Sequence, residues 1–146
     1  MTYNELKNEL YYLRENELVL SSKRLSLSTR KAEIMAELGG GVVDYSKDNV
    51  QTTPDPDARI IDAIFRADRA IATLLEEIKE LEDKTAHYES LVIRAKGVKG
   101  EILRLFFIEG KPMRQISARL DYVEKYAWQL WRQGIENLLE EVNNEH

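Results

Sequence analysis

Apolar residues recur every three or four positions through the first quarter of the chain, which is the spacing of one face of an α-helix. Charged side chains at Glu17, Arg24 and Lys31 interrupt this stripe, and the segment contains no Pro or Gly. The apolar members are Tyr3, Leu6, Leu10, Leu13, Leu20, Leu27, Ile34 and Leu38. The pattern predicts one long helix over residues 3–38. Three glycines at 39–41 end it, because Gly best accepts the left-handed conformation found after a helix.

A second stripe with the same spacing runs through residues 57–95. Its members are Ile60, Ile64, Ala67, Ile71, Leu74, Ile78, Leu81, Thr85, Tyr88, Val92 and Ala95. The segment between the stripes, 39–56, is predicted to be a loop that ends in residues suited to capping a helix N-terminus. Two helices of similar length joined by a loop predict a long antiparallel, coiled-coil-like helical hairpin over residues 1–95.

Shorter elements follow the glycines at positions 97 and 100. The pattern predicts helices over 99–108, 112–120 and 123 to about 142, with Pro112 at the first position of the middle one. Apolar residues on one face of these helices are predicted to point inward: Ile102, Leu105, Phe106, Met113, Ile116, Leu120, Ala127, Leu130, Trp131, Ile135, Leu138 and Leu139. Residues 143–146 are predicted to be a frayed tail. The sequence therefore predicts an all-α protein with a hairpin at 1–95 and a separate module at 97–142.

The C-terminal segment has the layout of a known DNA-binding module. Ile102–Phe107 is followed by Glu109–Gly110, then by Gln115–Leu120, a short turn, and Gly134–Leu138. This order resembles region four of bacterial sigma factors, in which a helix-turn-helix reads promoter DNA. Many members of that family have Ser as the N-cap of the recognition helix, where this chain has Val123. Because Val has no capping oxygen, Asp121 is expected to cap that helix instead.

The whole arrangement resembles small phage and prophage transcriptional regulators of the ArpU and late-gene-activator kind. This resemblance implies a DNA-binding regulator of transcription in a bacterial host, with double-stranded DNA as its partner. The absence of Cys and of a signal peptide predicts that the protein is cytoplasmic. It also implies that the hairpin serves for homodimerisation or for contact with RNA polymerase.

A helix-turn-helix places its second helix in the major groove. The match to the sigma region four pattern places five residues on the outward face of that helix: Lys125, Tyr126, Trp128, Gln129 and Arg132. Gln side chains pair with adenine and Arg or Lys with guanine or phosphate, while Lys111 and Arg114 lie where phosphate contacts are usual. The alternative is that the tryptophans pack in a core or an interface, and that the basic residues form an ordinary solvated face.

Charge is unevenly distributed along the chain. The net charge is −5, yet the stretch from Arg94 to Leu139 holds nine Lys or Arg against five Asp or Glu, a local charge of +4. The negative net charge alone argues against nucleic-acid binding, whereas the local positive charge of this stretch is compatible with it.

Other functional classes find little support in the sequence. There is no Cys, the two His are at 87 and 146, and no phosphate-binding glycine motif occurs, so no catalytic site, metal site or cofactor is predicted. No signal peptide or membrane span is predicted. Off the two stripes lie further apolar residues that predict self-association, with a dimer favoured: Leu18, Val19, Leu25, Ile61, Leu75 and Leu91. The alternative is that the C-terminal module folds back and covers them.

Two other functions remain open from the sequence. One is a DNA-packaging recognition subunit resembling a small terminase, a class that also combines a helix-turn-helix with coiled coil. The other is a coiled-coil adaptor whose DNA-binding module is vestigial, which the acidic net charge and the aromatic residues of the last helix favour.

Overall fold

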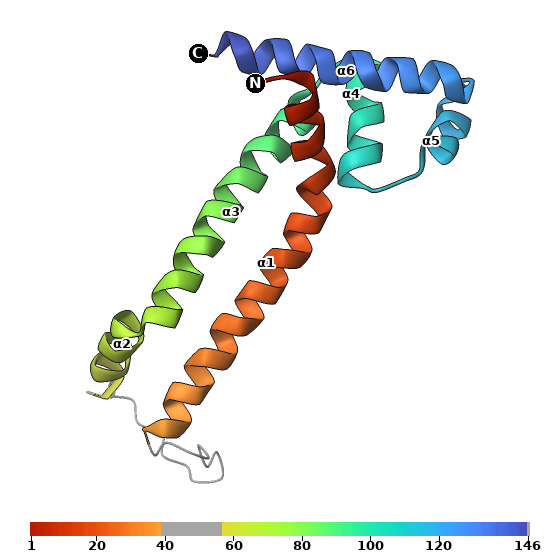
Figure 1. The fold of residues 1–146 in the computed structure, drawn as a ribbon. Coiled ribbons are helices and arrows are strands. Elements are labelled where there is room, and N and C mark those ends of the chain that lie inside the picture. The colour runs from red at the N-terminus through yellow and green to blue at the C-terminus, as the bar shows by residue number, and fades with distance from the viewer. Residues whose placement is uncertain (39–56, 146) are drawn as a thin grey trace. The chain divides into compact units, whose positions relative to one another are not determined.

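A computed structural model describes residues 1–38 and 57–145, and this part of the chain is all α-helical, without a β-strand (Figure 1). The elements are α1 (Tyr3–Glu37), α2 (Asp57–Ala67), α3 (Arg69–Arg94), α4 (Gly97–Leu103), a π-helical turn η1 (Arg104–Ile108), α5 (Met113–Leu120) and α6 (Glu124–Asn144). None of the described helices combines the length and the apolar character needed to cross a membrane. The predicted loop 39–56 lies outside the described residues.

The helices contribute to two compact units. The first unit comprises Met1–Val19 with Glu82–His146, and the second comprises Leu20–Leu81. Helices α1 and α3 each take part in both units. The start of the predicted hairpin therefore belongs to the same unit as the predicted C-terminal module.

In the second unit, α1 and α3 pack antiparallel through the predicted stripes. The stripe residues buried here are Leu20, Ile34, Ile71 and Ile78. Two ion pairs fix the direction, because Lys23 Nζ lies 2.6 Å from Glu77 Oε2 and Arg30 Nη2 lies 2.8 Å from Asp68 Oδ2. As residue numbers rise along α1, those of the partners fall, from Glu77 on α3 to Asp68 just before it.

The prediction of a single helix over 57–95 is wrong, because the helix is interrupted at Asp68, between α2 and α3. The carboxylate of Asp68 accepts a hydrogen bond from the N–H of Ile71 at 3.0 Å, which is the N-cap arrangement. The N–H of Asp68 still bonds to the carbonyl of Ile64 at 3.0 Å, and the carbonyl of Asp68 accepts from the N–H of Ala72 at 3.0 Å, so backbone hydrogen bonds continue on both sides of the break. Before the break, the second stripe also includes a residue that is not buried, since Ile60 is 59% exposed.

In the first unit, the beginning of α1 shares one core with the end of α3 and with α4 to α6. The buried members include Leu6, Leu10 and Leu13 from α1, Leu91 and Val92 from α3, and a larger set from the C-terminal helices: Ile102, Leu103, Leu105, Phe107, Met113, Ile116, Ala127, Leu130, Trp131, Ile135, Leu138 and Val142. Leu91, one of the apolar residues off the stripes, is completely buried here among residues of the C-terminal helices, so for this residue the alternative to self-association is correct.

Polar groups close this unit at two places. Arg104 Nη1 donates to the carbonyl of Ala95 at 2.6 Å, and thereby satisfies a carbonyl at the C-terminal end of α3 with a cation, where the helix dipole favours one. The side chain of Asn143 donates to the Met1 carbonyl at 3.3 Å. Residues 143 and 144 are helical, so the predicted fraying of the tail is wrong for them.

The shared core makes α1 part of the fold of the C-terminal helices, and Leu10 tests this. We expect Leu10→Ala to lower the free energy of unfolding by about 2–5 kcal/mol, as for other fully buried leucines, and to change the emission of the two tryptophans, both of which lie on α6. Leu18→Ala is the matched control on the same helix, because Leu18 is 73% exposed. Equal effects of the two substitutions on tryptophan emission would contradict the shared core.

The break at Asp68 gives the second unit a dependence on pH. The hydrogen bond from Arg30 holds the pKa of the Asp68 carboxyl below its ordinary value of 3.8. Because the folded pKa is depressed, this stabilisation is present above pH 4 and is lost as the pH falls through the folded pKa. We expect Asp68→Ala to lower the urea midpoint at pH 7, and Asp68→Asn, which keeps a capping oxygen, to lower it less. Both variants should lose the part of the acid-induced decline that this carboxyl causes.

Candidate nucleic-acid interface

Helix α5 begins one residue later than the sequence predicts. Pro112 has an extended backbone (φ −68°, ψ 149°) and stands at the N-cap rather than in the helix. Its carbonyl accepts hydrogen bonds from the N–H groups of Gln115 at 3.0 Å and Ile116 at 3.1 Å. Met113 and Ile116 are buried, so the apolar side of this short helix rests on the core, as predicted.

A tight turn at Asp121–Val123 joins α5 to α6. Asp121 has a positive φ of 61°, and its N–H bonds to the carbonyl of Ala118 at 3.3 Å. The next N–H, of Tyr122, reaches the carbonyl of Ser117 at 2.8 Å. These two bonds make the Schellman arrangement that ends a helix, with Asp in the place usually taken by Gly.

The expectation that Asp121 caps the last helix is therefore wrong, because Asp121 ends α5 instead of starting α6. Val123 is the N-cap residue of α6 and makes no side-chain hydrogen bond, because valine has no side-chain oxygen to accept one. Its carbonyl accepts the first bond of the helix, from the N–H of Ala127 at 3.0 Å. The turn is thus fixed by backbone hydrogen bonds on its α5 side rather than by a cap on its α6 side.

Helix α6 has one buried and one exposed face. The buried face carries Ala127, Leu130, Trp131, Gly134 and Ile135. On the opposite face lie Lys125, Gln129 and Arg132, which are all exposed and are spaced by four and three residues, so that they form one line along the helix. The structure thus brings these three sequence-predicted residues together, directly opposite the core.

The two other predicted residues of α6 flank this line. Tyr126 is exposed beside Tyr122, with 5.3 Å between ring centroids. Trp128 is 38% exposed and makes edge contacts with Phe106 at 5.6 Å and Trp131 at 5.2 Å. The line of polar and cationic side chains therefore has an aromatic border on each side.

Of the two tryptophans, Trp131 is a core residue. It is buried, and its ring lies 6.1 Å from that of Tyr11 on α1 and 5.8 Å from that of Phe107, centroid to centroid. The alternative in which a tryptophan packs inside is thus correct for Trp131. Trp128 remains at the surface.

Arg132 lies at the far end of the line, where α1 begins. Its guanidinium carbon lies 5.9 Å from the centre of the Tyr3 ring, and its Nε is 3.4 Å from Glu136 Oε1. Burial raises the pKa of Tyr3, while the positive charge of Arg132 opposes that rise. Since the Arg132 side chain is 71% exposed, these contacts orient the guanidinium without covering it.

The remaining two predicted residues lie at the start of α5. Lys111 is half-buried, and its N–H bonds to the carbonyl of Leu105 at 3.0 Å, which holds the turn to the end of η1. Arg114 is exposed in the first turn of α5.

A third cation reaches this turn from α1, since Arg14 lines the same hollow as Lys111. Sequence reasoning missed Arg14, because periodicity along α1 carries no information about distant residues.

Within residues 1–38 and 57–145, no group of three or more His, Cys, Asp or Glu residues is arranged to hold a metal ion. Comparison of the chain with protein-family models, with curated proteins and with solved structures finds no match in any of the three.

The left-handed residue in the turn gives a test of the α5–α6 geometry. A side chain in this conformation costs about 1–2 kcal/mol, and Asp and Asn tolerate it better than other residues. We expect Asp121→Val to lower the free energy of unfolding by about 1–2 kcal/mol, whereas Asp121→Asn should be near neutral and Asp121→Gly neutral or stabilising. Urea denaturation followed by tryptophan emission measures all three. An equal loss in all three variants would contradict the positive φ.

Proposed function

We propose that α4 to α6 form a helix-turn-helix of the sigma-region-four kind and that the chain binds double-stranded DNA with α6 in the major groove. The observation that carries the proposal is the line of Lys125, Gln129 and Arg132, which is fully outside the core on the helix that follows a tight turn. A helix with its polar line opposite its buried face fits into a major groove about 12 Å wide.

The residue types suit the two tasks of a DNA interface. Gln129, in the middle of the line, has the amide that pairs with the N6 and N7 atoms of adenine. Lys125 precedes it by one turn and Arg132 follows it, and both supply charge for guanine or for phosphate. Lys111 and Arg114 sit at the start of α5, where the first helix of such a module meets the DNA backbone.

The resemblance to phage regulators supports a role in transcription, with the remainder of the chain used for dimerisation or for contact with RNA polymerase. Exposed apolar side chains on α1 and α3 support such a contact, among them Leu18, Leu25 and Leu75. A dimer would present two copies of α6, and the spacing between the two half-sites would follow from the spacing between those copies.

Fluorescence anisotropy with a labelled 30-bp duplex taken from upstream of the gene tests the DNA proposal. We expect binding that weakens steeply between 50 and 200 mM salt, because each phosphate contact contributes about −0.9 to the slope of log K against log salt. The double variant Lys125→Ala/Arg132→Ala should bind more weakly, with a shallower slope wherever the lost contact was to phosphate. Gln129→Ala should instead reduce the preference for the preferred site by about 1–3 kcal/mol.

The matched control is Lys79→Ala, which removes a positive charge from an exposed site in the second unit. We expect this variant to bind DNA as the unchanged protein does. The proposal fails if no duplex is bound even at 50 mM salt, or if Lys79→Ala weakens binding as much as the changes on α6.

A further inference from the structure

A hollow of about 320 Å³ opens in the first unit between α1 and the turn that precedes α5. Aromatic and aliphatic side chains form part of its lining, namely Leu10, Tyr11, Phe106 and Phe107. The remaining lining residues are Arg14 from α1 and Gly110, Lys111 and Pro112 from the turn. Two cations thus line this hollow and no carboxylate does.

The guanidinium of Arg14 lies directly against the backbone of the turn. Gly110 has a φ of +70°, and a Cβ added there would collide with Nη1 and Cζ of Arg14. Gly110 is therefore constrained twice, by its own backbone conformation and by the side chain packed on it. This packing holds the charge of Arg14 next to the residue that precedes Lys111.

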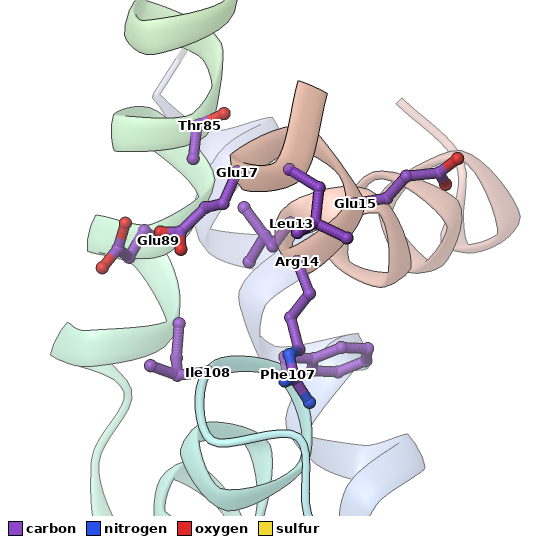
Figure 2. A pocket seen from close by; sticks show the side chains of 9 residues that line it. Leu13, Arg14, Glu15, Glu17, Thr85, Glu89, Phe107 and Ile108 are labelled. Atoms are coloured by element: carbon purple, nitrogen blue, oxygen red, sulfur yellow. The ribbon is translucent and has the colours of Figure 1, made fainter. Parts of the chain in front are cut away.

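The charge of Arg14 has no carboxylate partner in the part of the chain that the structure describes, since none of the ion pairs found there includes it. Carboxylates do occur nearby, because Arg14 also lines a second hollow of about 510 Å³ together with Glu15, Glu17 and Glu89. Figure 2 shows Arg14 extending in the direction of Phe107, while Glu15 points away from Arg14. The guanidinium is thus directed to the turn.

We propose that Arg14 and Lys111 together hold a DNA backbone phosphate in the hollow beside the start of α5. This inference rests on the proposed function and deepens it, because it makes α1 part of the DNA-binding surface. A guanidinium offers two parallel N–H donors that match phosphate oxygens, and an ammonium nearby adds a second positive charge. The proposed contact fixes the position of the protein on DNA and carries no sequence preference of its own.

The experiment measures binding of a mixed-sequence 30-bp duplex by anisotropy, from 50 to 200 mM salt, for the full chain and two variants at residue 14. Arg14→Met keeps the length of the side chain and removes its charge, and Arg14→Lys keeps the charge. We expect Arg14→Met to bind about five- to tenfold more weakly at 100 mM salt, with a log–log slope reduced in magnitude by about 0.9. Arg14→Lys should keep the slope and most of the affinity.

Thermal unfolding of each variant separates a phosphate contact from a structural role. The inference is overturned if Arg14→Met binds as the unchanged protein does, or if both variants lose affinity in proportion to a lowered unfolding temperature. Lys125→Ala/Arg132→Ala is measured alongside. If that variant loses affinity and Arg14→Met does not, only the inference about Arg14 is contradicted. If the protein without substitutions binds no duplex, both the proposed function and the inference are contradicted.

Discussion

The first unit depends on the burial of the beginning of α1 in the same core as the C-terminal helices. Leu6 and Leu10 are almost completely buried, and Tyr11, one residue further along, makes edge contacts with Phe106 and Phe107 at 5.8 and 5.4 Å. Each buried leucine contributes roughly 1.5–3 kcal/mol, which is large against the marginal stability of a small domain. Helices α4 to α6, only 7, 8 and 21 residues long, therefore gain much of their apolar cover from the opposite end of the chain.

Periodicity predicted the faces of the helices well and their partners poorly. The stripe residues Leu6, Leu10, Leu13, Leu20, Ile34, Ile71, Ile78 and Val92 are all buried, because a helix puts every third or fourth residue on one side whatever covers that side. Which residues cover that side depends on contacts between segments that are far apart in the sequence. Leu91 lies beside the stripe and is buried against the C-terminal helices, while Ile60 lies on the stripe and is exposed.

Two of the local errors have one physical origin, which is that a short polar residue can end one helix or begin the next. Asp68 begins α3 through a bond to the N–H of Ile71, and a mid-helix Asp flanked by alanine and arginine was the signal available in the sequence. Asp121 was expected to do the same for α6, yet it adopts a positive φ and ends α5. The two cases differ in backbone conformation, and no pattern of residue types distinguishes them. For the candidate site, the exposed line on α6 followed from helical spacing alone, whereas the approach of Arg14 to Gly110 required the tertiary fold.

The same core links the fold to the charge of the proposed interface. The chain carries a net charge of −5, so an anionic ligand is attracted only where cations are gathered. Helical spacing gathers Lys125 and Arg132 without help from the rest of the chain, but Arg14 reaches the turn before α5 only because Leu10 and Leu13, on the same turns of α1, are buried in the core. Loss of that burial would remove the support that holds Arg14 beside the turn, whereas the spacing of Lys125 and Arg132 within the helix would stay the same. The charge of the proposed DNA-binding surface therefore depends on the shared core as well as on the sequence of α6.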